Sequence, residues 1–389
     1  MNTVHAIAGG LLAILWFSRV IAYAWGLPRV PDITLPEWGN FDGKIPLPRV
    51  SIIVPARNEA AAVEGCITSR LALDYPDFEV FSVNDRSTDA TGSIMDGLAN
   101  SHPHNSRLKV IHVTELPPGW MGKTHAMWLA GKRSTGDILL FTDGDTCFHP
   151  DSIRRAVNYL LASNADHFVV YPTMLFKSAG ERMMISYFHA MLSFIHRPWK
   201  IADPKALDHV GVGAFNMVRR SAYEAIGTYE AMRMEVIDDL RLGRLIKLHG
   251  LRQRVALGPG VVTLHWVSSA MGIVRNLGKN SFAALRFQWT FVFAACLGLA
   301  YITLLPIIGL VFAPGWTKLG YALALVGILA IYFQTARITT ISPGYFFLHP
   351  VGAVLAIYTI LRSAWITSRH GVTWRGTSYP LEQFQNVRK

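Results

Sequence analysis

Apolar residues gather at both ends of the chain and leave a mixed region between them. Residues 6–24 carry one charge, Arg19, and predict a membrane helix of marginal length for the roughly 20 residues that a bilayer requires. Three more apolar stretches, which also predict membrane helices, follow from Thr290 to about Leu361. The expected divisions are a membrane helix in 1–27, a mixed domain over 48–289, membrane helices over 290–368 and a basic tail over 369–389.

The mixed region alternates short apolar runs with helix-like segments. Strands are predicted over 50–54, 78–83, 108–113 and 138–141, and helices over 60–73, over 88–98 and from Lys123 onward. This alternation is typical of a doubly wound α/β domain, in which ligands bind at the carboxyl ends of the strands. Polar residues follow several of the predicted strands, so we expect the functional site at that edge.

Asp143-Gly144-Asp145 directly follows the predicted strand 138–141, with Thr142 between them. Two carboxylates one residue apart at a strand end suit a divalent cation such as Mg²⁺ or Mn²⁺, which shares its oxygen ligands with substrate phosphates. The pair therefore indicates a nucleotide-diphosphate site. Taken alone, the pair is a weak signal, and without supporting context a solvated turn is the favoured interpretation.

Composition supports a membrane protein, because 51% of the residues are hydrophobic and 16% are charged. The formal charge of +11 suits an anionic lipid surface or a phosphorylated substrate. The basic residues are scattered and accompany no groove-reading motif, so a nucleic-acid partner is not expected. Cys66, Cys147 and Cys296 have no metal-ligand spacing and cannot all pair, which fits a reducing compartment.

Three segments taken together resemble the signature segments of family-2 glycosyltransferases. They are residues 51–59, with the sequence SIIVPARNE, residues 83–89, with VNDRSTD, and residues 141–145, with FTDGD. Their order and spacing match that family, and the resemblance covers roughly residues 48–290. It implies a GT-A (Rossmann-like) nucleotide-sugar domain that uses a divalent metal, Mn²⁺ or Mg²⁺, and a nucleotide-diphosphate sugar as donor.

The resemblance also implies roles in donor binding. Asp85 is similar to the aspartate that hydrogen-bonds the nucleotide base, and Pro55, Arg57 and Glu59 match the loop that shapes this pocket. A turn or helix cap would also explain Asp85. Lys123 resembles a basic residue that approaches the nucleotide in relatives, although a solvated lysine at a helix start would look the same.

The metal and the base are also implied by the resemblance. Asp145 matches the direct metal ligand, and Asp143 matches the carboxylate that mainly holds the ribose and metal water. His265 is a candidate third metal ligand or diphosphate contact, or else a structural histidine. Asp238-Asp239 aligns with the acidic pair of the family, which makes Asp239 the general base and Asp238 the neighbour that orients it or raises its pKa. An acidic helix start would also explain the pair.

One segment departs from the pattern of processive relatives. These carry Gln/Arg-x-x-Arg-Trp before the membrane helices, whereas this chain has Leu285-Arg286-Phe287-Gln288-Trp289. A polymer-holding tunnel is therefore not expected. Residues 182–199 are rich in Met, Phe, Tyr and Ile and predict a helix that lies either in the membrane interface or in a core.

Charges beside the membrane helices give two indications of orientation. Arg29, Lys44 and Arg49 follow the first helix and place the mixed domain in the cytoplasm. Three further spans would place the tail charges on the other side, against the same rule, so one apolar stretch could be re-entrant or interfacial. These tail charges are Arg369, Arg375, Arg388 and Lys389.

The expected function is that of a multi-pass cell-membrane enzyme with its catalytic domain in the cytoplasm. It would transfer a sugar from a uridine diphosphate sugar or a similar donor to a lipid acceptor, with inversion at the anomeric carbon. The alternatives are a processive polysaccharide synthase and a catalytically silent membrane scaffold that senses nucleotides. The scaffold is disfavoured because a binding module does not need the base Asp239.

Overall fold

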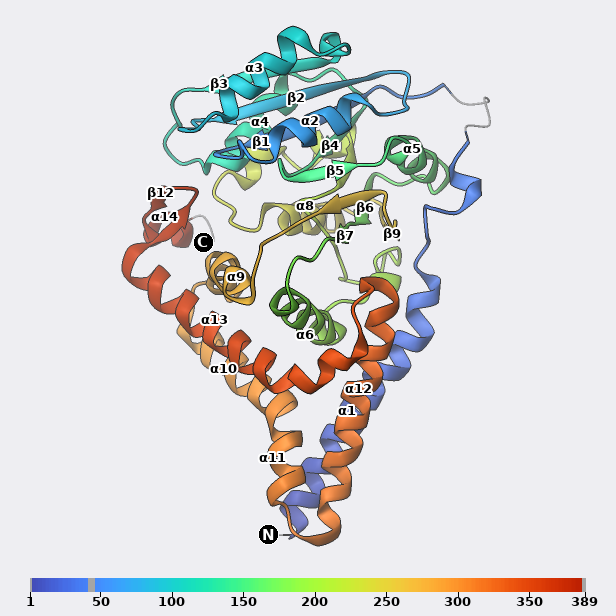
Figure 1. Cartoon of the computed structure of the whole chain (residues 1–389), viewed down its shortest axis with the longest axis vertical. Coiled ribbons are helices and arrows are strands. Elements are labelled where there is room, and N and C mark those ends of the chain that lie inside the picture. The colour runs from blue at the N-terminus through green and yellow to red at the C-terminus, as the bar shows by residue number, and fades with distance from the viewer. Residues whose placement is uncertain (1, 41–45, 387–389) are drawn as a thin grey trace. The chain divides into compact units, whose positions relative to one another are not determined.

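The structure is a computed structural model that describes residues 2–40 and 46–386 (Figure 1). The chain divides into two compact units, which we call the sheet unit and the helical unit. The sheet unit contains Val30–Leu175 and Pro198–Trp266. The helical unit contains the described residues of Met1–Arg29, together with Phe176–Arg197 and Val267–Gln385.

A seven-stranded mixed sheet forms the centre of the sheet unit, in the order β3-β2-β1-β4-β8-β6-β9. The first four strands of the chain run parallel, and β8 is antiparallel to both of its neighbours. Of the predicted strands, β3 and β4 have the expected bounds, and β1 and β2 extend two residues further. The seven strands are β1 (Val50–Ala56), β2 (Phe78–Asp85), β3 (Leu108–Val113), β4 (Ile138–Phe141), β6 (His167–Tyr171), β8 (Asn216–Arg219) and β9 (Gln253–Leu257).

Helices cover both faces of this sheet, and each face has its own hydrophobic core. On β1, Ile52 and Val54 belong to the core with α2 (Val63–Leu71) and α5 (Ser152–Ala162), whereas Ile53 belongs to the core with α4 (Gly122–Arg133) and α8 (Asp238–Leu248). Successive strand residues point to opposite faces, so a strand buried on both faces has a continuous apolar sequence. The other helices of the sheet unit are α3 (Thr91–Ser101) and α7 (Arg220–Ala225).

The helices predicted to begin at residues 60 and 88 begin three residues later, as α2 and α3. The residues before them form two loops that hold each other. The Asp89 carboxylate accepts hydrogen bonds from the backbone of Ala60 (3.1 Å) and Thr91 (3.0 Å), and the Asn58 side chain accepts one from Thr88 (2.8 Å). Such side-chain bonds to the backbone compete with helix formation.

A second, three-stranded sheet has the order β5-β10-β7. Its strands are β5 (Thr146–Phe148), β7 (Thr173–Met174) and β10 (Val262–Leu264). β5 begins directly after Asp145 and runs antiparallel to β10. This sheet therefore fixes the path of the chain as it leaves the Asp-Gly-Asp turn.

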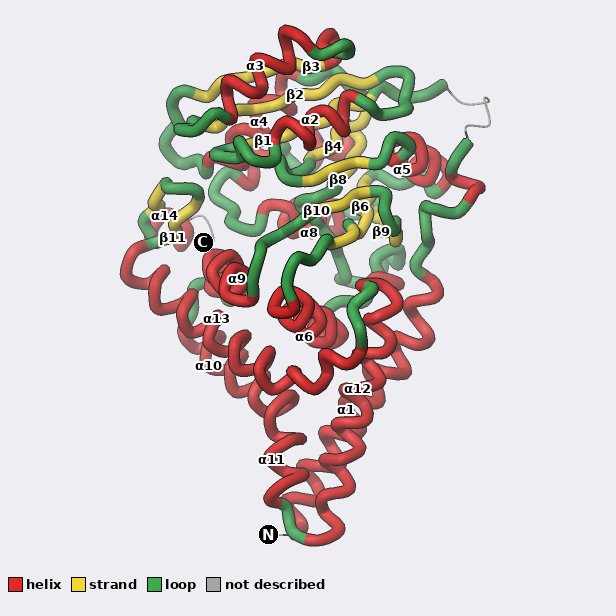
Figure 2. Tube along the Cα trace, in the orientation of Figure 1, coloured by secondary structure: helices red, strands yellow, loops and turns green. Residues whose placement is uncertain are grey.

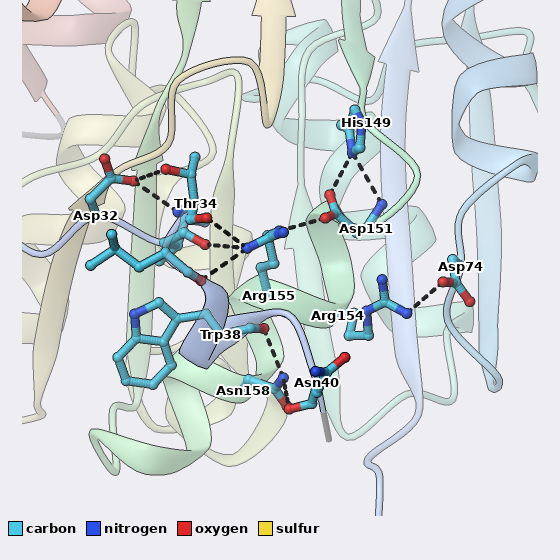
Figure 3. A network of polar contacts seen from close by, with 12 residues as sticks. Asp32, Thr34, Trp38, Asn40, Asp74, His149, Asp151, Arg154, Arg155 and Asn158 are labelled. Atoms are coloured by element: carbon cyan, nitrogen blue, oxygen red, sulfur yellow. Dashed lines mark hydrogen bonds and ion pairs between the residues drawn. The ribbon is translucent and has the colours of Figure 1, made fainter. Parts of the chain in front are cut away.

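Residues 33–40 are tied to α5 by a network of polar contacts (Figure 3). The Arg155 guanidinium donates to the carbonyl oxygens of Ile33, Thr34 and Leu35, each at 3.1 Å, and pairs with Asp151 at 2.5 Å. The Asn158 amide donates to the carbonyl oxygens of Trp38 (2.9 Å) and Asn40 (3.0 Å). The segment that follows the first helix is thus held by side chains of the sheet unit.

The helical unit contains four helices that are long and apolar enough to cross a membrane, which confirms the four predicted stretches. Figure 2 shows that this unit is almost entirely helical. α1 and α12 lie side by side (Figure 1), and a Cβ at Gly9 would lie 3.1 Å from the Tyr321 nitrogen. Such close approach of two backbones requires small residues. The candidate spans are Asn2–Arg29, Trp289–Phe312, Gly315–Thr339 and Pro343–His370, which contain α1 (Asn2–Gly26), α10 (Trp289–Leu299), α11 (Leu305–Phe312), α12 (Lys318–Thr339) and α13 (His349–His370).

α6 (Ala179–Ile195) belongs to the helical unit, although its sequence lies between strands of the sheet unit. It packs against α12, α13 and α9 (Ala270–Ala284). Residues 176–197 and 267–289 therefore group with the membrane helices, a division that a continuous domain over 48–289 did not anticipate. Apolar side chains of α6, among them Ala190 and Phe194, pack in one hydrophobic core with residues of α1 and α12.

The predicted tail over 369–389 contains regular structure in its described part. A hairpin of β11 (Val372–Trp374) and β12 (Thr377–Tyr379) is followed by α14 (Leu381–Asn386). The charges of Lys44, Arg388 and Lys389, which entered the orientation argument, lie outside the described residues.

Candidate functional site

The carboxyl ends of β1, β2 and β4 bring the three signature segments to one edge of the sheet. These strands are parallel neighbours, and Pro55 pairs with Val83 and Ala56 with Asn84, so the ends of β1 and β2 lie side by side and near the turn that follows β4. A Cβ at Gly144 would lie 3.1 Å from the Pro55 carbonyl oxygen, which places the Asp-Gly-Asp turn against the end of β1. The predicted edge of the sheet therefore holds the polar residues together.

Asp85 is buried and surrounded by arginines. Arg86 donates to both carboxylate oxygens, at 2.7 Å from Nε and 3.1 Å from Nη2, and the Arg57 guanidinium lies 3.9 Å away. Arg57 and Asp85, which were predicted to line the same pocket, thus lie close together. Arg86 is a further partner of Asp85 that the sequence reasoning did not identify. Glu59 lies at the loop between β1 and α2, where its backbone nitrogen donates to Thr91 Oγ1 at 2.8 Å.

The N-terminus of α4 lies directly against Asp85. A Cβ at Gly122, the first residue of α4, would overlap the Asp85 carboxylate, so a larger residue here would displace the side chains of Asp85 and Arg86. A helix N-terminus carries partial positive charge and stabilises a nearby carboxylate. Gly122 therefore permits the close approach of the α4 backbone to the Asp85 carboxylate.

Lys123 joins the Asp-Gly-Asp turn to the acidic pair Asp238-Asp239. Its ammonium lies 2.8 Å from Asp143 Oδ1 and 3.2 Å from Asp238 Oδ1, and its side chain is 16% exposed. Burial disfavours the charged amine, but the carboxylates of Asp143, Asp238 and Asp239 outweigh it and raise the pKa of Lys123. The alternative of a solvated lysine at a helix start is therefore wrong.

The backbone of Gly213 connects Asp239 to the Asp-Gly-Asp turn. The Gly213 nitrogen donates to Asp239 Oδ2 at 2.8 Å, and the Gly213 carbonyl accepts from the Asp143 nitrogen at 2.8 Å. A Cβ at Gly213 would overlap Asp143 Oδ2, so a glycine at this position allows the close packing. Asp238 and Asp239 also open α8, so the predicted acidic helix start is present as well.

The acidic pair has an environment suited to proton transfer near neutral pH. Burial and the neighbouring Asp238 carboxylate raise the pKa of Asp239 to about 6, with Lys123 opposing them. Burial also raises the pKa of Asp238, whose carboxylate contacts Lys123 and accepts a 3.3 Å hydrogen bond from the Tyr229 hydroxyl. A carboxylate with a pKa near the working pH is a suitable general base.

Asp145 and His265 occupy facing positions at the end of one ladder. Leu264 of β10 pairs with Thr146 of β5, so the next residues outward are His265 and Asp145. Within residues 2–40 and 46–386, no three His, Cys, Asp or Glu side chains form a ready metal cage. Mg²⁺ and similar cations use one or two carboxylates together with substrate phosphates, so Asp143 and Asp145 fit such an ion. A role of His265 as third ligand stays a prediction.

Arg70 is a residue near the site that the sequence reasoning missed. It is fully buried in α2 and donates to the Asp143 carbonyl oxygen at 2.8 Å. The sequence did contain a sign of its burial, because Arg70 follows the buried positions Val63, Cys66 and Ile67 at the helical spacing of three and four residues. A charged residue in such a stripe indicates a buried polar partner.

Known proteins share this sequence pattern. Residues 48–285 match a family described as glycosyltransferase like family 2. The beta-monoglucosyldiacylglycerol synthase of Synechocystis is 27% identical over 219 residues, which cover 56% of this chain and 44% of that protein. The probable glycosyltransferase YdaM of Bacillus subtilis is 30% identical over 164 residues, which cover 41% of this chain and 37% of that protein. The chain thus spans less than half of the length of these curated relatives.

A solved structure shares the fold. The mannosyltransferase PcManGT from Pyrobaculum calidifontis, in complex with GDP-Man and Mn²⁺, is 21% identical and has a TM-score of 0.53, with 94% of this chain and 99% of that chain covered. This likeness confirms the predicted GT-A class for the mixed sheet. With the family match over residues 48–285 and the three signature segments at one sheet edge, the chain belongs to glycosyltransferase family 2.

Proposed function

We propose that this protein transfers a sugar from a nucleotide-diphosphate sugar, a uridine diphosphate sugar in the first instance, to a hydroxyl group of a lipid. The observation that carries the proposal is the connection between the two halves of the site. Lys123 bridges Asp143 to Asp238, and Gly213 bridges Asp143 to Asp239. A site that only bound nucleotides would not need a second acidic pair with a raised pKa.

The donor half is formed by the ends of β1, β2 and β4. In this proposal Asp85 accepts a hydrogen bond from the base, with Pro55, Arg57 and Glu59 around the pocket. Asp143 and Asp145 would hold Mn²⁺ or Mg²⁺, which offsets the negative charge on the departing diphosphate. His265 and Asp145 adjoin the last pair of the β5–β10 ladder, and His265 is a candidate contact for the ion or the diphosphate.

Asp239 performs the proton transfer. The acceptor oxygen attacks the anomeric carbon from the face opposite the diphosphate, the carbon–diphosphate bond breaks, and the hydroxyl proton moves to an Asp239 carboxylate oxygen. The Gly213 and Leu240 nitrogens, each 2.8 Å from one Asp239 oxygen, fix the orientation of this carboxylate. Asp238 raises the basicity of Asp239, and Lys123 limits the repulsion between them. Direct attack from the opposite face inverts the anomeric configuration.

The proposal of a lipid acceptor rests on the helical unit. Four candidate membrane spans accompany the sheet unit, and α6 packs with these spans. A relative, 27% identical over 219 residues, is named as a beta-monoglucosyldiacylglycerol synthase. The sheet unit would face the cytoplasm, where nucleotide sugars are made.

The test is incubation of the purified full-length protein with radiolabelled UDP-sugars and GDP-sugars, Mn²⁺ and total membrane lipid. A lipid transferase places the label in the organic phase, in a product with one discrete mass increment. A water-soluble ladder would instead identify a processive synthase. Nucleotide binding without any transfer would identify the silent scaffold.

A further inference from the structure

Arg70 carries a positive charge in the interior of the sheet unit. Its side chain is fully buried between α2 and the strands, among apolar neighbours such as Ile67 and Phe148. Among the described residues no ion pair of its guanidinium is recorded, although the Asp145 carboxylate favours its charge from further away. Burial of a guanidinium without such a partner is costly, so its hydrogen bonds must compensate.

These hydrogen bonds converge on the Asp-Gly-Asp turn. Arg70 Nη2 donates to Thr146 Oγ1 at 2.6 Å, to the Asp143 carbonyl oxygen at 2.8 Å and to Thr142 Oγ1 at 3.3 Å. Arg70 Nη1 donates to the Cys66 carbonyl oxygen at 2.6 Å. One nitrogen thus holds the residue before Asp143, the backbone of Asp143 itself and the residue after Asp145.

We propose that Arg70 is a positioning residue for the divalent-cation site. It fixes both ends of the turn from the buried side, so that the Asp143 and Asp145 carboxylates are presented together. Groups that orient the residues of a metal site typically change metal affinity by about 10–100-fold when they are removed. This inference rests on the proposed function, because it assumes that Asp143 and Asp145 hold the ion.

The turn retains other hydrogen bonds when Arg70 is replaced. Thr142 Oγ1 lies 2.9 Å from Thr146 Oγ1 and donates to the Ala214 carbonyl oxygen at 2.8 Å, and Thr146 Oγ1 lies 2.9 Å from the Asp143 carbonyl oxygen. We therefore expect Arg70→Met to fold, with a turn that is less well fixed. Arg70→Lys retains the charge but loses the planar fork that reaches several acceptors.

A matched control is present in the same unit. Arg155 also donates to three backbone carbonyls, those of residues 33–35, but its hydrogen bonds hold the segment after the first helix and the Asp151 carboxylate (Figure 3). Arg155→Met therefore removes a similar number of hydrogen bonds elsewhere. It separates a general loss of stability from a specific loss of cation binding.

The experiment measures Mn²⁺ binding by electron paramagnetic resonance and UDP binding by calorimetry, with and without Mn²⁺. In Arg70→Met we expect the affinity for Mn²⁺ with UDP to fall about 10-fold or more, while metal-free UDP binding stays unchanged. Arg70→Lys should recover part of the loss, and Arg155→Met should bind Mn²⁺ as the wild type does. Thr146→Val removes one acceptor of Arg70 and should also lower the affinity for Mn²⁺. This variant replaces Arg70→Met as the test if Arg70→Met does not fold.

Two results would overturn the assignment. Wild-type Mn²⁺ affinity in Arg70→Met, or in Thr146→Val if that variant alone folds, would show that Arg70 does not position the site. An equal loss of Mn²⁺ binding in Arg155→Met would show a general effect of stability. If the wild type itself binds neither UDP nor GDP in a Mn²⁺-dependent way, the proposed function fails and the Arg70 assignment fails with it.

Discussion

Asp238 and Asp239 are adjacent in the sequence but meet different partners. Asp239 accepts hydrogen bonds from two backbone nitrogens, whereas Asp238 contacts the Lys123 ammonium and the Tyr229 hydroxyl. Repulsion between the two carboxylates is relieved when Asp239 takes up a proton. These residues therefore determine the pH range in which the proposed base can act.

The pH dependence of transfer follows from Asp239. A base acts in its deprotonated form, and burial with the Asp238 charge raises the pKa of Asp239 to about 6. We expect kcat/KM to be constant above this pH and to fall as the pH drops through about 6. In Asp238→Asn, which removes a like charge, the fall should occur at lower pH. A rate that is independent of pH between 5 and 8 would contradict this assignment.

Lys123 stabilises the folded site, because its charge lies among three carboxylates. Lys123→Met should lower the free energy of unfolding by about 3–5 kcal/mol, as expected when one partner of a buried ion pair is removed. The loss should be larger at pH 8 than at pH 5, because protonation of Asp239 at the lower pH removes one repelling charge. Thermal unfolding at both pH values measures this difference. Lys123→Arg is the control, and a loss that does not depend on pH would argue against the bridge.

At the scale of elements, the first turn of α4 positions Asp85. Gly122→Ala should weaken metal-free UDP binding, because the added Cβ overlaps the Asp85 carboxylate. Gly97→Ala in α3 is a matched control, since a Cβ there meets no atom within 4 Å. It should leave binding unchanged and stabilise α3 by up to about 1 kcal/mol. Equal UDP affinity in the two variants would show that the approach of α4 to Asp85 is not needed.

The elements that carry the site were predictable where apolar runs mark them. β1, β2 and β4 are short buried strands with polar residues after them, so both their existence and their shared edge follow from the sequence. The contacts of Arg70 and Gly213 with the Asp-Gly-Asp turn were not predictable from the sequence. Their contacts join residues about 70 positions apart, as between Arg70 and Thr142, and depend on how α2 and the loop before β8 pack in three dimensions.

The positions of helix starts and the place of α6 also required the structure. Asp89 and Asn58 use their side chains to bind loop backbone, and this delays α2 and α3. The composition of 182–199 allowed two interpretations, interface or core. The structure shows α6 packed with α12 and α13 in the helical unit, because its apolar side chains face these helices.

At the scale of the whole molecule, the proposed function predicts a topology. In a chain without its native cysteines, Glu64→Cys on α2 should not react with an impermeant reagent added to intact cells. Trp316→Cys should react, because Trp316 is 73% exposed in the first turn of the candidate span Gly315–Thr339 and would lie on the opposite side. Labelling of Glu64→Cys from outside would place the sheet unit away from the cytoplasm and contradict the proposal.

The most direct test of the account separates donor binding from transfer in Asp239→Asn. The variant keeps the size of the side chain but cannot accept the proton. The account predicts normal Mn²⁺-dependent binding of the nucleotide sugar and a rate of transfer to lipid that is lower by about 10²–10⁴-fold, as is typical for a lost general base. Calorimetry and the radiolabel in the organic phase measure the two quantities on one preparation. Transfer near the wild-type rate with normal donor binding would contradict the central claim.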